Sequence, residues 1–183
     1  MELEAWFEKG LFPDDYIEAM EKNKESLLYI YDHFQAHDRN YDQLKKRKLR
    51  VIVLTEDWCG DAMLNIPILL RIAEQTAMDV RFLFRDENLE LMDNYLTNGT
   101  ARSIPIFIFI DEAGREVARW GPRAESIQNF VDESLSSLPP KDTADYEQKA
   151  KEMYMFMNKS YQENTDFWDA VHQSIIDRLD NCL

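Results

Sequence analysis

The residues of this chain that can do chemistry gather around one cysteine, in the segment Trp58-Cys59-Gly60-Asp61-Ala62. The segment follows a short β-branched run and precedes a stretch with the spacing of a helix. A thiol at a strand-to-helix turn faces free backbone N–H groups and the positive end of the helix dipole, and both favour the nucleophilic thiolate. Gly60 allows a tight turn, and Trp58 supplies an apolar shoulder beside the sulfur. The segment therefore predicts a nucleophilic thiol.

Short apolar runs and helical segments alternate on both sides of this cysteine, and these elements must position it. The runs predict strands over residues 51–54, 80–84, 106–110 and 116–120, and the spacing between and after them predicts helices over 63–77, 89–96 and 124–135. Strand–helix–strand units require parallel crossovers, and the last two strands are close enough to form a hairpin. The expected fold class is α/β, with a central mixed sheet of about four strands flanked by helices.

Helical segments also lie before and after this alternation. Residues 1–48 have mostly helical spacing, and Pro139-Pro140 marks a second boundary. A helical stretch then resumes and can divide into two helices at Asn164-Thr165-Asp166. We therefore expect an N-terminal helical extension (1–48), a central domain (49–138) and a C-terminal helical extension (139–183).

The segment around Cys59 resembles the active site of the thioredoxin family, in which Trp-Cys-Gly-Pro-Cys lies between a central strand and its helix. Pro67, eight residues after Cys59, falls where thioredoxins have a kinking proline. Ile104-Pro105, just before the third predicted strand, matches the family's cis-proline loop, and Gly121 matches the glycine at the rim of its substrate groove. The resemblance covers about half of the chain. It implies a thioredoxin-like fold that binds substrate at Ile104, Pro105 and Gly121.

One departure from the family pattern decides the expected chemistry. Ala62 replaces the second cysteine, so a mixed disulfide on Cys59 cannot be resolved by its neighbour. The resemblance then implies a monothiol thiol–disulfide oxidoreductase that acts on mixed disulfides, with Cys59, Asp61 and Trp58 in the catalytic site. It implies no cofactor, and protein thiols or low-molecular-weight thiols as partners. A catalytically inactive binding module and a redox sensor stay open as alternatives.

The second departure is a local excess of acid. Asp61 replaces the family's proline, and Glu56 and Asp57 precede the cysteine. Negative charge near a thiol raises its pKa. We therefore expect a less activated thiol than in thioredoxins. Val53 stands where many thioredoxins have a buried aspartate for proton relay, and Asp61 is a candidate to take over that role.

Two further residues have two open interpretations each. Arg102, just before the Ile104-Pro105 loop, is either a solvated side chain or a partner for the carboxylate of a small thiol such as glutathione. Cys182, next to the last residue of the sequence, is either an inert thiol or a remote resolving cysteine on a mobile tail.

Composition narrows the classes of partner. The formal net charge is −14, which repels nucleic acid phosphates and anionic lipid headgroups, so we expect neither as a partner. No apolar run approaches the ~18 residues of a membrane helix. The first residues do not resemble a signal peptide, and with two cysteines the cytoplasm is the expected location. His33, His37 and His172 all lie outside the central domain. His33 and His37, one helical turn apart, are expected at the surface, and no metal site is expected. Nothing in the sequence determines the oligomeric state.

Overall fold

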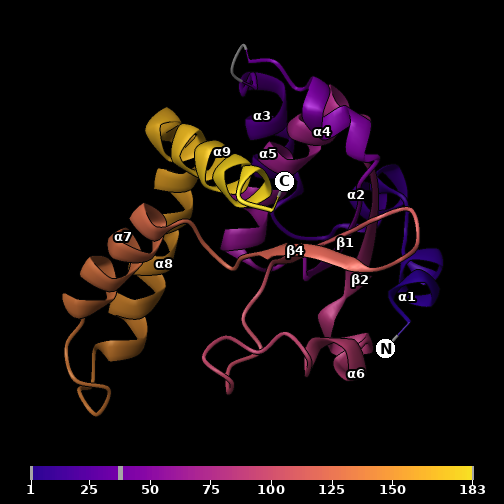
Figure 1. Ribbon diagram of the computed structural model, residues 1–183. Helices are drawn as coiled ribbons and strands as arrows, with labels where there is room; N and C mark the ends of the chain where they lie inside the picture. The colour runs from indigo at the N-terminus through magenta and orange to yellow at the C-terminus, as the bar shows by residue number, and fades with distance from the viewer. Residues whose placement is uncertain (1, 37–38, 183) are drawn as a thin grey trace.

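The computed structural model describes residues 2–36 and 39–182, and its centre is a four-stranded sheet (Figure 1). The strands are β1 (Arg50–Thr55), β2 (Asp79–Phe84), β3 (Ile106–Ile110) and β4 (Glu116–Trp120). Their order in the sheet is β2-β1-β3-β4. The expected mixed sheet of four strands is confirmed, with ends that differ from the prediction by one residue at most.

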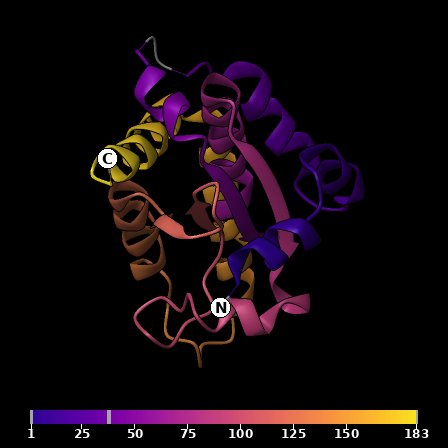
Figure 2. The ribbon, with the colours of Figure 1, turned by 45° about the vertical axis from the view of Figure 1, so that its right-hand side comes forward.

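Helices cover both faces of this sheet. α3 (Lys24–His33) and α9 (Thr165–Asp180) both pack against α5 (Gly60–Thr76), and α1 (Leu3–Lys9) packs against β1 and β2. In the view of Figure 2 the indigo N-terminal helices lie at the right and the brown and yellow C-terminal helices at the left. All five side chains of β3 are buried for this reason, since a strand between two covered faces has no solvent-facing side. The run Ile-Phe-Ile-Phe-Ile, with no polar alternation, is the sequence signature of that position.

The direction of β3 corrects one expectation. β1 and β2 are parallel, as a strand–helix–strand crossover requires, but β3 is antiparallel to β1. The helix predicted over 89–96 is only α6 (Leu89–Met92), preceded by the 3₁₀ turn η1 (Arg85–Glu87). The segment from η1 to residue 105 provides no helix long enough to return the chain along the sheet. β3 starts beside the end of β1, where Ile106 pairs with Leu54.

The helix α5 (Gly60–Thr76) is the central helix of the fold and begins directly after Cys59. Only the first residue and Arg71, Glu74 and Gln75 of this helix escape full burial, and Pro67 lies inside it. The predicted start was three residues too late because Gly60, Asp61 and Ala62 carry no apolar periodicity of their own. The other domain helix is α7 (Glu125–Ser136), close to its predicted bounds.

The N-terminal segment forms α1 (Leu3–Lys9), α2 (Pro13–Ala19), α3 (Lys24–His33) and α4 (Asp42–Arg47). It is joined to the sheet by backbone as well as by side chains. Leu11 exchanges both backbone hydrogen bonds with Phe82 of the edge strand β2, each at 2.9 Å. The ring of Tyr16 stacks on Phe82 with the centroids 4.4 Å apart. The exposed edge of the sheet is thereby partly covered.

The C-terminal segment divides into α8 (Tyr146–Glu163) and α9 (Thr165–Asp180), as the Asn164-Thr165-Asp166 signal predicted. The Asn164 side chain accepts a hydrogen bond from the Asp166 N–H at the start of α9. α9 packs along α5 and β4, while α8 packs against α5 and α7 (Figure 1). Met157, Tyr161 and Trp168 are buried in these contacts, whereas Tyr154, Met155 and Phe156 of α8 are exposed.

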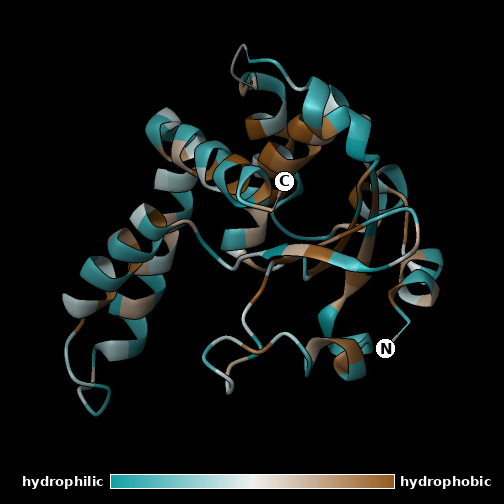
Figure 3. Cartoon of the chain, viewed as in Figure 1, coloured by the Kyte–Doolittle hydropathy of each residue, from teal (hydrophilic) through white to brown (hydrophobic). Residues whose placement is uncertain are grey.

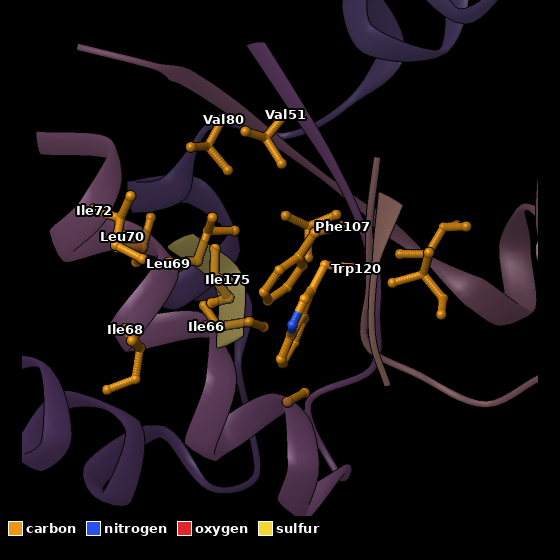
Figure 4. Close-up of a cluster of buried hydrophobic side chains, with 14 of the residues drawn as sticks. Val51, Ile66, Ile68, Leu69, Leu70, Ile72, Val80, Phe107, Trp120 and Ile175 are labelled. Atoms are coloured by element: carbon orange, nitrogen blue, oxygen red, sulfur yellow. The ribbon is translucent and has the colours of Figure 1, made fainter. Parts of the chain in front are cut away.

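One hydrophobic core unites all of these elements. Figure 4 shows Phe107 and Trp120 from the sheet facing Ile66 and Leu69 of α5 and Ile175 of α9. The rings of Phe107 and Trp120 stack with their centroids 5.1 Å apart. The hydropathy colouring of Figure 3 places brown residues on α5 and the strands, with teal on the outward sides of the surrounding helices. In the part of the chain that the structure describes, no helix combines the length and apolar character needed to cross a membrane.

Candidate functional site

Cys59 lies where β1 and its turn give way to α5, at the N-cap position of that helix. The residue is buried, with 8% of its surface exposed. Its Sγ lies 3.5 Å from the carbonyl oxygen of Ile104, to which the thiol donates a hydrogen bond. The Ile104–Pro105 peptide bond is cis, as predicted from the resemblance. The structure thus brings the predicted nucleophile and the predicted substrate-binding loop into direct contact.

The environment of Cys59 disfavours the thiolate. Burial, and next the charge of Asp61, raise the pKa of Cys59 to about 11. The backbone N–H groups of Ala62 and Asp61 and the positive charge of Arg123 act in the opposite direction, which is the helix-start effect expected from the sequence. Desolvation outweighs them. The expected direction of the shift therefore holds, but its main cause is burial rather than the neighbouring carboxylates.

Asp61 is buried and is held by two side chains from distant parts of the chain. Its Oδ2 forms an ion pair with Arg123 Nη2 at 2.7 Å, and its Oδ1 accepts a hydrogen bond from Arg123 Nε at 2.9 Å. The hydroxyl of Tyr161, on α8, donates to the same Oδ1 at 3.0 Å. Burial and the negative charge of Asp61 raise the pKa of Tyr161, so this hydroxyl stays a donor. The carboxylate is thus neutralised within the fold.

The other two acids of the segment are turned toward neighbouring loops instead of the thiol. Asp57 accepts hydrogen bonds from the backbone N–H groups of Glu21 and Lys22, at 2.8 and 3.0 Å. Glu56 accepts one from the backbone N–H of Asp86 at 2.8 Å. Both therefore fix the turn before Cys59 to surrounding segments. The expectation that three carboxylates act on the thiol was wrong for these two.

Trp58 presents its ring at the surface beside the buried thiol. It is 45% exposed, and the guanidinium of Arg85 lies 5.1 Å from the centre of its ring. A cation at that distance is attracted to the face of an indole. Arg85 also donates to the backbone carbonyl of Arg102 at 3.1 Å, so it links Trp58 to the loop before Ile104. The predicted apolar shoulder is present at the mouth of the site.

Gly121 has a structural reason to be glycine. Its φ is +120°, in the region that side chains rarely adopt, and a Cβ there would overlap the carbonyl oxygen of Pro105. The adjacent Pro122 follows a second cis peptide bond, and its carbonyl accepts a hydrogen bond from the Asn65 side chain of α5 at 2.9 Å. Gly121 thus lets β4 end tightly against the Ile104-Pro105 loop.

The helix α8 covers the turn that carries the thiol. A Cβ added to Gly60 would overlap the side-chain oxygen of Asn158 on α8, so the two segments are closely packed there. Asn158, Tyr161 and Arg123 are residues of this site that the sequence did not reveal. A signal existed only for Arg123: an acid at the buried start of a helix needs a cationic partner, but the sequence does not say which.

The Arg102 side chain is engaged with a carboxylate of this chain. Its guanidinium pairs with Asp93 through two hydrogen bonds, at 2.7 and 2.9 Å, on an exposed part of the surface. This geometry makes Arg102 part of a surface ion pair and leaves its predicted carboxylate-binding role a prediction.

Cys182 is partly buried, and Arg47 donates to its backbone carbonyl at 3.0 Å. Arg47 lies just before β1 and Cys59 just after it, so the two thiols lie toward opposite ends of a strand ~20 Å long. A disulfide requires Cα atoms within ~7 Å. In this conformation Cys182 is therefore not placed to resolve a disulfide on Cys59.

The histidines differ in their exposure. His172 is 1% exposed and its Nε2 lies 2.9 Å from the Tyr41 hydroxyl, so it is a core residue. His33 is exposed, as predicted, while His37 lies outside the described residues. Among the residues with described positions, no three His, Cys, Asp or Glu side chains are grouped so that they could hold a metal ion.

Comparisons with known proteins place this geometry in a family. A crystal structure of an HIV epitope scaffold aligns with a TM-score of 0.61 and 13% identity, over 93% of this chain and 93% of that one. A protein of unknown function from Pseudomonas aeruginosa aligns with a TM-score of 0.57 and 13% identity, over 91% of this chain and 95% of that one. These two likenesses show a shared fold.

A mutant thioredoxin from Halobacterium salinarum NRC-1 is 25% identical over 58% of this chain and 90% of its own, with a TM-score of 0.35. A search of the curated proteins finds no match to this sequence. The sequence model of a protein family described as thioredoxin matches residues 10–137, which is more than half of the chain. The match begins inside the predicted N-terminal extension and ends at the predicted boundary before Pro139. The chain therefore belongs to the thioredoxin family.

Proposed function

We propose that this protein is a monothiol thiol–disulfide oxidoreductase that acts on mixed disulfides through Cys59. The observation that carries the proposal is the contact between Cys59 Sγ and the Ile104 carbonyl, 3.5 Å apart, at the edge where β1 and β3 meet. An extended substrate pairing with the backbone of Ile104 would bring its own sulfur beside the thiol. Ala62 stands in place of a resolving cysteine, which restricts the chemistry to one thiol.

The proposed reaction has two exchange steps. The Cys59 thiolate attacks the sulfur of the small thiol in a mixed disulfide, a new S–S bond forms between Cys59 and the small thiol, and the protein's thiolate leaves and takes up a proton. A second small thiol, as its thiolate, then attacks the sulfur of the small thiol held on Cys59. This step releases the symmetrical small disulfide and restores Cys59. In the net reaction the protein sulfur becomes a free thiol, and one free small thiol is consumed, which ends in the symmetrical disulfide with the small thiol that came from the substrate.

The described surroundings give each neighbour a role in this proposal. The N–H groups of Asp61 and Ala62 stabilise the thiolate when it forms. The exposed ring of Trp58 provides an apolar contact for the substrate beside the sulfur. Asp61, held by Arg123, is a positioning residue in the first turn of α5 and a candidate for passing the thiol proton to solvent. Protein and low-molecular-weight thiols are the proposed partners, and the cytoplasm the proposed location.

A second candidate is a binding module that keeps the fold and the groove but does not turn over. Two observations favour it: burial raises the pKa of Cys59 to about 11, and α8 packs directly over Gly60. A thiol in that state is almost fully protonated at neutral pH and exchanges slowly. The two candidates differ in one measurable property, which is turnover.

The test is reduction of a glutathione-capped peptide by purified protein with free glutathione as the second thiol. We expect release of peptide thiol above the uncatalysed rate, loss of that activity in Cys59→Ser, and its retention in the matched control Cys182→Ser. Activity should rise with pH between 7 and 9, because the thiolate fraction rises. A wild-type rate equal to that of Cys59→Ser across this range would reject the oxidoreductase and favour the binding module.

A further inference from the structure

A cavity of about 480 Å³ is lined by Gly121 and by Arg123, the partner of Asp61. It is bounded by β4, by the loop that contains Thr97, and by the last turns of α9. Three of its lining side chains are arginines: Arg119, Arg123 and Arg178. None of the described residues that line it is acidic. In a chain with 35 acidic and 21 basic residues, a pocket with this lining departs sharply from the average surface.

The charge of this pocket comes from two of the three arginines. Arg123 is already engaged with Asp61 and with Gln128, so its charge is balanced. Arg119 and Arg178 have no carboxylate within ion-pair distance among residues 2–36 and 39–182. The only hydrogen bond of the Arg178 side chain in that part of the chain is from Nε to the backbone carbonyl of Arg119, at 2.9 Å. The terminal nitrogens of both guanidiniums are therefore available to a ligand.

Both arginines line this pocket from regular elements that are bonded to each other. Arg119 lies on β4 and Arg178 in the last turn of α9, and Arg178 Nε donates to the backbone carbonyl of Arg119. A second bond, from Trp120 Nε1 to Ser174 Oγ at 2.9 Å, fixes α9 to the same strand one helical turn away. Two cations that line one pocket without a counter-charge repel each other, and an anion bound in that pocket reduces the repulsion. The site is therefore organised before any ligand arrives, which lowers the entropy lost on binding.

We propose that this pocket binds a small anion with two or more negative charges, of the diphosphate or polycarboxylate type. Guanidinium groups match the oxygen geometry of phosphate and carboxylate through paired hydrogen bonds. The hydroxyls of Thr97 and Ser174 and the amide of Asn181 add uncharged donors to the lining. A cavity of this volume suits a small molecule. The proposal does not depend on thiol exchange at Cys59, because no sulfur takes part in the binding.

The experiment is calorimetric titration of the full-length protein with two sulfur-free probes, inorganic pyrophosphate and citrate, at constant ionic strength. We expect saturable binding of one equivalent, and a shift of the Trp120 indole N–H signal in NMR spectra at the same ligand concentrations. Tighter binding of pyrophosphate would assign the ligand to the diphosphate type, and tighter binding of citrate would assign it to the polycarboxylate type. Binding by the Cys59→Ser variant should equal that of the wild type, which separates this site from the proposed activity.

Two substitutions test the arginines. Arg119→Gln and Arg178→Gln should each weaken binding about tenfold or more, since each removes a charged hydrogen-bond donor. Arg115 is an exposed arginine of the β3–β4 turn that pairs with Asp111. Arg115→Gln is therefore the matched control, and it should leave the affinity for both probes unchanged. Thermal melting checks that all three variants fold, and Ser174→Ala provides a second lining variant. No saturable binding of either probe, or equal weakening by Arg115→Gln, would overturn the proposal.

Discussion

The carboxylate of Asp61 and the guanidinium of Arg123 meet in the first turn of α5, with Oδ2 and Nη2 2.7 Å apart and both side chains largely buried. The pair fastens the segment after β4 to the helix that carries Cys59. It also explains how an acid can occupy the position of the family's proline without leaving an unbalanced charge beside the thiol. The same pair therefore affects both the stability of the fold and the state of the cysteine.

Replacing Asp61 by Asn should lower the free energy of unfolding by about 2–4 kcal/mol, because Arg123 is then left partly buried without its counter-charge. Urea denaturation followed by circular dichroism measures the change. Asp93→Asn is the matched control, since it breaks the exposed pair with Arg102 and should leave the denaturation midpoint unchanged. Equal midpoints for Asp61→Asn and wild type would show that the buried pair contributes nothing.

The alkylation rate of Cys59 should rise about tenfold per pH unit from pH 7 and level off only near pH 11, because burial raises the pKa of the thiol to about 11. The sign follows from the reactive form: only thiolate reacts, and a raised pKa moves its formation to higher pH. The measurement uses iodoacetamide on a Cys182→Ser background, with free glutathione as the reference thiol. A plateau below pH 9 would contradict the assigned environment.

The same alkylation assay should show a more reactive Cys59 in Asp61→Asn than in the wild type. Removing the negative charge and leaving that of Arg123 uncompensated should lower the pKa of Cys59, so alkylation at pH 8 should be faster than in the wild type. The substitution is thus expected to destabilise the fold while activating the thiol. A slower reaction would mean that Asp61 assists the thiol instead of restraining it.

Gly121→Ala should destabilise the protein by about 3 kcal/mol or more, because a Cβ there combines a φ of +120° with overlap of the Pro105 carbonyl. Gly99→Ala is the control for backbone conformation alone. Gly99 also has a positive φ, +72°, but a Cβ there meets no atom within 4 Å, so a loss of only about 1 kcal/mol is expected. Similar losses for the two variants in thermal or urea denaturation would refute the close-approach argument.

Much of the fold was predictable from the sequence because it depends on local pattern. The β-branched run of β1 and the fully apolar run of β3 predict buried strands, because apolar side chains then point to both faces of the sheet. Asn164 predicted the break between α8 and α9, because its side chain caps α9 by a hydrogen bond to the N–H group only two residues further on. Trp58-Cys59-Gly60 and Ile104-Pro105 predicted that the thiol and the cis-proline loop belong to one site.

The state of that site was decided by tertiary structure alone. Whether Cys59 is activated depends on its burial and on the charges of Asp61 and Arg123. Arg123 and Tyr161, which hold Asp61, lie 64 and 102 positions along the chain from Cys59, and no local pattern says that they meet there. The direction of β3 likewise depends on how far the segment after β2 travels, not on the residues of β3 itself. Sequence spacing determines which elements form and which residues start them, because those depend on short-range hydrogen bonds and side-chain periodicity. Burial and charge balance arise only when distant segments pack, and these set the pKa of Cys59.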